Sequence, residues 1–135
     1  MTRRWLPIVS AVMAAACAPV PASQSGALVG TYGGQHIRMT IAAAGSAIGY
    51  DCAAGTLVGP LPVRGSFVNA GTHTPGTGGP ERQGEIRPAY QATYSGRVIA
   101  DRIELAVDVD LPSGRTRLGP FRLQRGPEGN LLRCL

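Results

Sequence analysis

Cys52 and Cys134 are the residue pair whose type and spacing most directly suggest a chemical role. Cys52 shares the alternating phase of Ile48 and Tyr50, and Cys134 shares that of Leu132, so both thiols are expected to point inward. A bond between them would enclose 81 residues, which in the chain-entropy model stabilises the fold by about 4 to 5 kcal/mol. No CxxC spacing and no third ligand accompany them, so we expect a structural disulfide rather than a redox or metal pair.

The two histidines, His36 and His73, are the candidates for acid-base or zinc chemistry. Neither has a histidine, cysteine or carboxylate partner at close spacing in the sequence. His36 is expected on the outward face of a strand beside Arg38, as a solvated residue. A shared site of His36, His73 and Glu81 would require a long loop to fold back, so we predict no metal and no cofactor.

Asp108 and Asp110 lie on one face of a predicted strand, where two carboxylates could share a cation or act as an acid and a base. We interpret them as a solvated face, because no predicted pocket residue points toward them. Ser95 and Ser113 lack the flanking residues and the histidine of a serine nucleophile. No active site is therefore predicted, and a hydrolase that uses Asp108, Asp110 or His36 is the third interpretation.

The charge of the chain offers little to a nucleic acid. The 135 residues contain 13 basic side chains, all arginine, and 8 acidic ones. Arg3 and Arg4 belong to a sorting segment, which leaves a net charge near +3 on the remainder. Because these arginines are scattered along the chain, no nucleic-acid partner is predicted.

Residues 1–16 have the order of an export signal, a short positive head followed by an apolar run from Trp5 to Ala16. The run is shorter than the roughly 20 residues of a membrane-spanning helix. The signal peptide predicts an exported protein of the cell envelope or periplasm. Residues 17–26, with prolines and small polar side chains, are expected to be a flexible tether before a single domain at 27–135.

The end of the apolar run, Ala14-Ala15-Ala16-Cys17, resembles a bacterial lipobox. The resemblance implies that Cys17 becomes a lipidated amino terminus, which makes the chain a lipoprotein with a lipid membrane anchor. Cleavage after Ala22 is the competing interpretation, and it would remove Cys17. Three cysteines are an odd number, and Cys17 is the one left over, which favours lipidation.

The domain alternates apolar and polar residues with period two, and it contains no run of helical period. The clearest strand places five apolar residues on one face: Ile103, Leu105, Val107, Val109 and Leu111. If Ala100-Asp101 is the turn before it, Val98 faces Ile103 and Arg97 faces Glu104. That register aligns the apolar faces of two neighbouring strands and pairs opposite charges outside.

Further strands are predicted at Ala27–Tyr32 and Arg64–Ala70, with a bulge at Gly119-Pro120, where Leu118 is out of phase with the residues that follow. Pro60 and Pro62 suggest an edge strand or an irregular one. The fold class is therefore all-β, an antiparallel small barrel or sandwich of about eight strands with one disulfide.

Residues 71–88 are expected to form one long loop of Gly, Pro, Thr and charged residues. Such loops on a rigid sheet are either binding loops or disordered. If the domain binds a macromolecule, the loop and nearby outward residues are the predicted contact. These residues are His36, Arg38, His73, Glu81, Arg82, Glu85 and Arg87.

Four short motifs carry a resemblance that covers nearly all of the exported chain: GGQH at 33–36, DCAAG at 51–55, GGP at 78–80 and the terminal CL. The chain resembles a family of small, uncharacterised exported bacterial proteins, which implies a barrel-like fold but no activity. In architecture alone it resembles the membrane-bound inhibitors of c-type lysozyme. Those insert a loop with a serine and a lysine, whereas Ser95-Gly96-Arg97 is the nearest string here and no lysine exists.

The function expected from the sequence is that of a non-enzymatic envelope protein whose barrel presents loops or a face to a protein or surface partner. The alternative is a carrier of a small apolar ligand inside the barrel. The inward residues are mostly full-sized aliphatic side chains, so a packed core is expected instead of a cavity.

Overall fold

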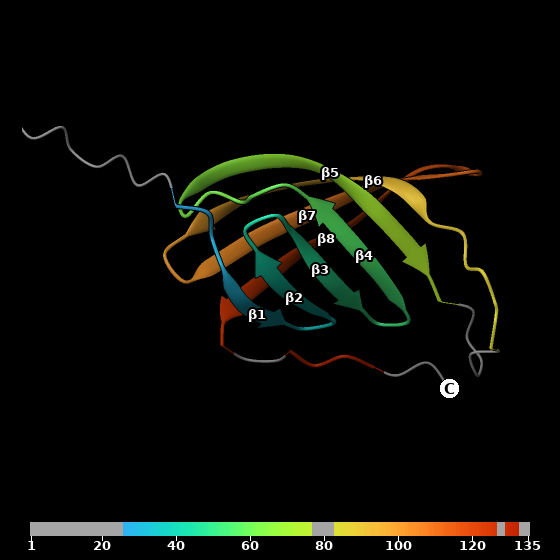
Figure 1. The fold of residues 1–135 in the computed structure, drawn as a ribbon, viewed down its shortest axis with the longest axis horizontal. Helices are drawn as coiled ribbons and strands as arrows, with labels where there is room; N and C mark the ends of the chain where they lie inside the picture. Colours follow the sequence, from blue (N-terminus) through green and yellow to red (C-terminus); the bar gives the residue numbers. More distant parts are fainter. Residues whose placement is uncertain (1–25, 77–82, 127–128, 133–135) are drawn as a thin grey trace, which may run out of the picture.

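The computed structural model describes residues 26–76, 83–126 and 129–132, which form a closed barrel of antiparallel strands (Figure 1). The strands are β1 (Gly30–Gly34), β2 (Ile37–Ala42), β3 (Gly45–Tyr50), β4 (Ala53–Val58), β5 (Gly65–Pro75), β6 (Tyr90–Ile99), β7 (Arg102–Leu111) and β8 (Gly114–Arg125). Each strand pairs with the next one along the chain, and β8 returns to pair with β1. The predicted all-β fold of about eight strands is confirmed, and it is a barrel. The described residues include no helix with the length and apolar character that a membrane span needs.

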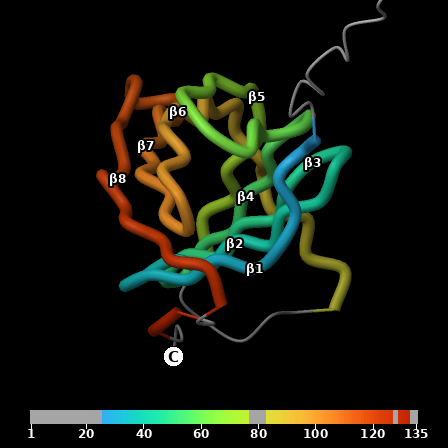
Figure 2. The backbone as a smooth tube through the Cα atoms, turned by 90° about the vertical axis from the view of Figure 1, so that its left-hand side faces the viewer, coloured from blue at the N-terminus to red at the C-terminus, as the bar shows by residue number. Residues whose placement is uncertain are grey.

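Side chains from every strand fill the interior, and Figure 2 shows the strands arranged as a ring around it. In β2, Ile37, Met39 and Ile41 are buried whereas Arg38 and Thr40 are exposed, which is the alternation expected of a strand with one apolar face. The largest fully buried side chains are Tyr32, Tyr94, Ile37, Met39, Leu57, Leu61, Ile103, Leu105, Leu123, Val98, Val107 and Val109. The expected packed core is present.

The pairing of β6 with β7 has the predicted register. Val98 lies opposite Ile103 inside the barrel, and Arg97 lies opposite Glu104 outside, with 3.5 Å between the guanidinium and the carboxylate. The predicted bulge at Gly119-Pro120 is also confirmed. One residue of β7 separates Leu105 from Val107, whereas two residues of β8 separate their partners Phe121 and Leu118. The extra residue restores the inward phase for the end of β8.

The predicted loop at 71–88 begins too early, because β5 continues to Pro75; the connection to β6 runs from 76 to 89, of which the structure describes 76 and 83–89. Residues 71–75 pair with β4 on one side, and residues 71–73 pair with β6 on the other. Pro60 and Pro62, predicted in an edge or irregular strand, lie in the connection between β4 and β5. Pro62 forms only an isolated bridge with Ala27 there, so the missing N–H groups interrupt no named strand.

Tyr94 explains why two glycines are needed in the middle of strands. Its side chain lies across inward positions of β4 and β5, and a Cβ built on Gly55 would be 2.2 Å from its hydroxyl. A Cβ on Gly71 would be 2.7 Å from its ring and 2.0 Å from the carbonyl oxygen of Thr56. The large side chain of Tyr94 therefore occupies the space that side chains at positions 55 and 71 would need, so both positions require glycine.

The barrel has two ends of different character (Figure 1). We call one the entry end, formed by residues 26–29, the β2–β3 turn, the β4–β5 connection at 59–64 and the β6–β7 turn. We call the other the loop end, formed by the β1–β2 and β3–β4 turns, the connection at 76–89 and the β7–β8 turn. The described part of the C-terminal segment, 129–132, lies against the β1–β2 turn at the loop end.

Candidate functional site

His36 occupies the turn between β1 and β2, not a strand as predicted, with a left-handed backbone φ of 66°. Its backbone N–H donates to the carbonyl of Asn130 at 2.9 Å. Its exposed ring contacts the carboxylate of Asp51 through Nδ1. The second Asp51 oxygen accepts a hydrogen bond from the backbone N–H of Leu132 at 2.6 Å.

Asp51 thus joins three segments of the loop end: its own turn before β4, the His36 turn and the C-terminal segment. His36 has no carboxylate close to it in the sequence, and the fold brings it one from Asp51, 15 residues further along the chain. A histidine and a carboxylate at the surface hold these turns in one arrangement. His36 also lines a pocket of about 420 Å³ with Phe121 and Arg122, but none of the described residues that line it is a serine, threonine or cysteine that could act as a nucleophile.

Cys52 follows Asp51 in the same turn. It has a left-handed backbone φ of 58°, and it is exposed. The prediction that Cys52 continues β3 with an inward thiol is therefore wrong, because β3 ends at Tyr50 and β4 begins at Ala53. Its carbonyl accepts a hydrogen bond from Gly76, the first residue after β5. Cys17 and Cys134 lie outside the described residues.

His73 is not at the surface. It lies on β5 with 7 % of its area exposed and its ring centroid 5.2 Å from that of Tyr50, so its predicted role in a surface contact is wrong. Burial lowers the pKa of the imidazole below its usual range, which keeps the ring neutral. Within the described residues its Nδ1 atom has no hydrogen-bond partner.

Beside His73, two buried tyrosines form a chain of hydrogen bonds. The Tyr50 hydroxyl donates to that of Tyr94 at 3.4 Å, and the Tyr94 hydroxyl donates to the carbonyl of Thr72 at 2.6 Å. Burial raises the pKa of both hydroxyls, so both stay protonated. The group satisfies polar atoms inside a packed barrel, and it opens to no pocket that the described residues form.

Asp108 and Asp110 pair with arginines on the neighbouring strand. Arg117 contacts both oxygens of Asp108 at 2.9 Å, and Arg115 contacts Asp110 at 2.9 Å. Hydrogen bonding from Arg117 lowers the pKa of the Asp108 carboxyl. Asp110 is exposed and Asp108 half-buried on the outer face of β7, and their partners come from β8, whose arginines sequence reasoning left unassigned. Among the residues described, no three His, Cys, Asp or Glu side chains gather as metal ligands.

The other residues predicted to contact a partner lie on the barrel wall, in the connection between β5 and β6, or outside the described residues. Arg38 is exposed on the outer face of β2, between Gly33 and Gly49. Glu85 is exposed and Arg87 half-buried in the part of the connection that the structure describes, whereas Glu81 and Arg82 lie outside the described residues. The structure therefore brings His36 and the loop to the same end of the barrel.

Two exposed apolar residues at the loop end were missed. Ile86 has 94 % of its area exposed, between Glu85 and Arg87, and Leu132 has 64 % exposed in the C-terminal segment. The isolated isoleucine in a polar loop is the signal that could have singled out Ile86. A large apolar side chain held in water by a loop is a candidate anchor for a partner.

Comparison of the chain with protein-family models, with curated proteins and with solved structures finds no match. The resemblance to small exported bacterial proteins stays a prediction. The geometry of the two barrel ends therefore carries the functional interpretation.

Proposed function

We propose that this chain is an exported, lipid-anchored envelope protein without enzymatic activity, which binds a protein or surface component through the loop end of its barrel. One observation carries the proposal: the described chain enters at one end of the barrel, and the long connection lies at the other (Figure 1). A tether that leaves from the entry end orients the loop end away from the membrane. The loop end is then free to meet a partner.

The loop end has the parts of a binding surface on a rigid support. Ile86 supplies an exposed apolar side chain, and Glu85 beside it supplies a charge. The links from Asp51 to His36 and Leu132 hold the neighbouring turns in place. Turns that are already fixed in the free protein lower the ordering cost of binding.

The interior of the barrel favours surface binding over the carriage of a ligand. Tyr32, Tyr94 and Met39 are fully buried among aliphatic side chains from the other strands. Carriage of a small molecule would require several of these side chains to leave their places, with the loss of their packing.

A disulfide between Cys52 and Cys134 would lock the C-terminal segment to the loop end. The support is the hydrogen bond between Leu132 and Asp51, the neighbour of Cys52. Cys134 follows Leu132 by two residues, and two residues span at most about 7 Å, a length that allows Cys134 to reach Cys52. The bond would fix the segment that carries the exposed Leu132.

Photo-crosslinking in the exporting cell tests the partner site. A photoreactive residue at Ile86 is compared with one at Ala47, which is exposed on the outer wall of β3. We expect discrete adducts with one envelope component from position 86 and none from position 47. With the photoreactive residue moved to the neighbouring position Glu85, the substitution Ile86→Ser in the same chain should lower the yield of these adducts. Equal adducts from positions 86 and 47, or none from position 86, would contradict the proposed site.

A further inference from the structure

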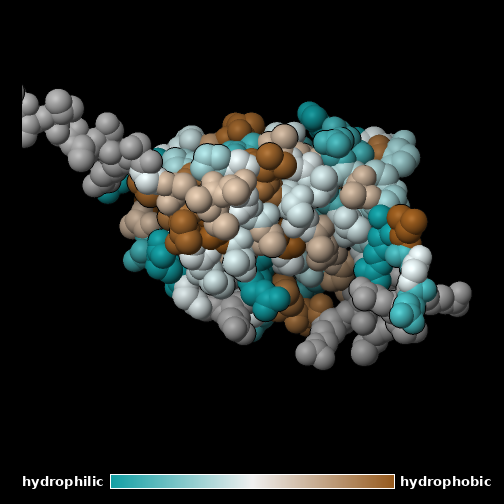
Figure 3. All heavy atoms as spheres, in the orientation of Figure 1, coloured by the Kyte–Doolittle hydropathy of each residue, from teal (hydrophilic) through white to brown (hydrophobic). Residues whose placement is uncertain are grey.

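The entry end exposes more large apolar side chains than any other part of the described surface. Of the six exposed large hydrophobic residues among those described, four are Val29, Val58, Val68 and Ile99, which lie at this end or close to it. Val68 is 74 % exposed and Val58 is 65 % exposed. Figure 3 shows hydrophobic side chains beside hydrophilic ones where the N-terminal trace meets the barrel.

Two of these side chains, Val68 and Ile99, line separate grooves of the entry end. Val68 lines a groove of about 640 Å³ together with Pro60 and Val63 of the β4–β5 connection. The side-chain amide of Asn69 donates to the carbonyl of Val58, which holds the end of β4 beside that groove. Gly26 and Ala27 also line the groove, so any preceding chain leaves from its edge.

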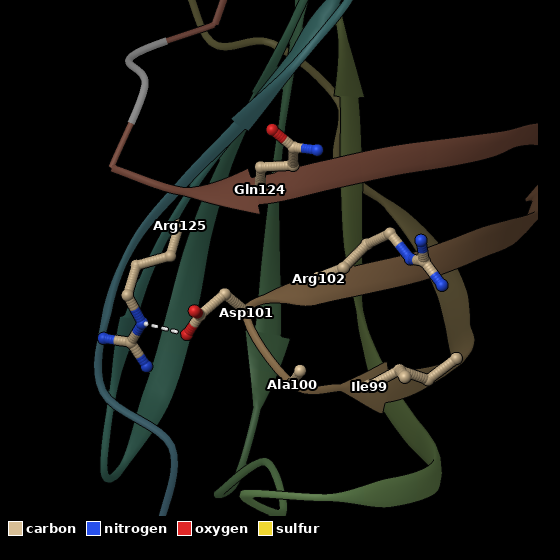
Figure 4. Close-up of a pocket in the computed structure, with 6 residues that line it drawn as sticks. All are labelled: Ile99, Ala100, Asp101, Arg102, Gln124 and Arg125. Atoms are coloured by element: carbon tan, nitrogen blue, oxygen red, sulfur yellow. Dashed lines mark ion pairs between the residues drawn. The ribbon is translucent and has the colours of Figure 1, made fainter.

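Arginines border the apolar surface. Arg125 donates to the carbonyl of Val29 at 3.3 Å and lies 3.5 Å from the Asp101 carboxylate in the β6–β7 turn. Figure 4 shows this pair, with Arg102 extended away from it beside Ile99. Arg102 and Arg64 form no ion pair among the described residues, so the entry end has an excess of positive charge.

We propose that the entry end docks onto a phospholipid bilayer with anionic headgroups, with its valines and isoleucine in the interface and Arg64 and Arg102 on lipid phosphates. The proposal rests on the lipid anchor at Cys17. Eight residues, 18–25, separate that cysteine from Gly26, and the chain from Cys17 to Gly26 spans at most about 30 Å, which keeps this end close to the surface. Apolar side chains beside Arg64 and Arg102, which form no ion pair with another described residue, match the two layers of such an interface.

The tether allows a surface with low membrane affinity to dock. Four aliphatic side chains and two arginines give little affinity to a free domain, but a short linker raises the effective concentration of the membrane at the entry end. Docking would then fix the barrel with its loop end outward. A second copy of the chain and a protein partner are the competing occupants of the same surface.

Tryptophan fluorescence measures the docking directly. The full chain with Trp5→Phe, which removes its only tryptophan, receives Val68→Trp at the entry end or, as the matched control, Ile86→Trp at the loop end. Each protein is purified from membranes and reconstituted in phosphatidylcholine–phosphatidylglycerol vesicles whose acyl chains carry bromine. We expect blue-shifted, quenched emission from position 68 and water-like, unquenched emission from position 86.

Added Arg64→Gln and Arg102→Gln should each lower the ratio of docked to undocked domain roughly fivefold, without loss of sedimentation with the vesicles. Sedimentation without quenching at position 68 would overturn the docking but leave the anchor and the partner site intact. A blue shift that persists without vesicles would assign the surface to a second copy and overturn the docking. Failure to sediment would overturn the anchor and the docking together, but not the crosslinks from position 86.

Discussion

At the scale of single residues, His73 shows how one buried group links the stability of the barrel to pH. The imidazole is enclosed beside Tyr50, and burial lowers its pKa. In the unfolded chain the ring takes up a proton near pH 6.5, whereas in the folded chain it resists protonation. The unfolded state therefore binds more protons below that pH, and the free energy of unfolding decreases as the pH falls.

We expect the free energy of unfolding to drop between pH 7.5 and pH 5.5 by at most about 1.4 kcal/mol on account of His73. In the His73→Leu variant this part of the pH dependence should disappear, and stability at pH 7.5 should hold, since Nδ1 has no partner to lose. Urea unfolding of both proteins at the two pH values measures the difference. An identical pH dependence in both would show that the His73 pKa is not lowered.

At the scale of strands, alternation predicts pairing where both partners alternate without interruption. Val98 and Ile103 lie opposite one another as expected, and the phase change at Leu118 marks a true bulge. The end of β5 was missed because Gly71 and Pro75 have the composition of a loop. Its threonines pair well in a sheet, but the pairing depends on β4 and β6, which local sequence does not contain.

Contacts between distant strands are also what sequence reasoning missed at the candidate site. Asp51 reaches His36 and Leu132 because the two turns and the C-terminal segment share one end of the barrel. The need for glycine at position 71 comes from the Thr56 carbonyl of β4 and the Tyr94 ring of β6, which lie on the two neighbouring strands. These contacts and the requirement for glycine arise from the way the strands come together in the barrel, so the neighbouring residues in the sequence do not reveal them.

Gly71→Ala tests the fit between Tyr94 and its two glycines. The new Cβ would meet the Thr56 carbonyl and the Tyr94 ring, so strands β4 and β5 must separate locally. We expect a loss of about 2 to 3 kcal/mol in the free energy of unfolding. Gly49→Ala is the matched control in a neighbouring strand, where a Cβ lies 3.4 Å from Leu131, and it should change stability by less than about 0.5 kcal/mol. Comparable losses in the two variants, measured by urea unfolding, would show that Thr56 and Tyr94 do not close the space at position 71.

At the scale of the whole molecule, the barrel separates two surfaces by its length. The entry end bears exposed valines and the arginines at 64, 102 and 125, and the loop end bears Ile86 and the Asp51 links. The wall between them carries ion pairs on β7 and β8, such as Arg117 with Asp108. Exposed pairs of this kind add little stability, but they keep that side of the wall hydrated. A rigid barrel with two different ends suits a protein held at one end and recognised at the other.

The mass of the natively exported protein tests both covalent parts of this arrangement. We expect a chain that begins at Cys17 and carries the mass of attached acyl groups, because lipidation accounts for the cysteine that the disulfide leaves over. After denaturation without reduction, alkylation should add nothing. After reduction it should add two groups, at Cys52 and Cys134. Cys17→Ser should remove the lipid mass and leave both alkylation results unchanged.

The measurement tests the lipidation and the disulfide independently. A chain that begins at Ser23 without lipid would show that the signal is cleaved in the ordinary way, and the entry end would lose its tether to a membrane. Alkylation of Cys52 before reduction would show that the C-terminal segment is held at the loop end by the Asp51 hydrogen bond without a covalent link. In that case the exposed Leu132 would belong to a segment that can leave the barrel, and Ile86 alone would remain as the apolar anchor of the proposed partner site.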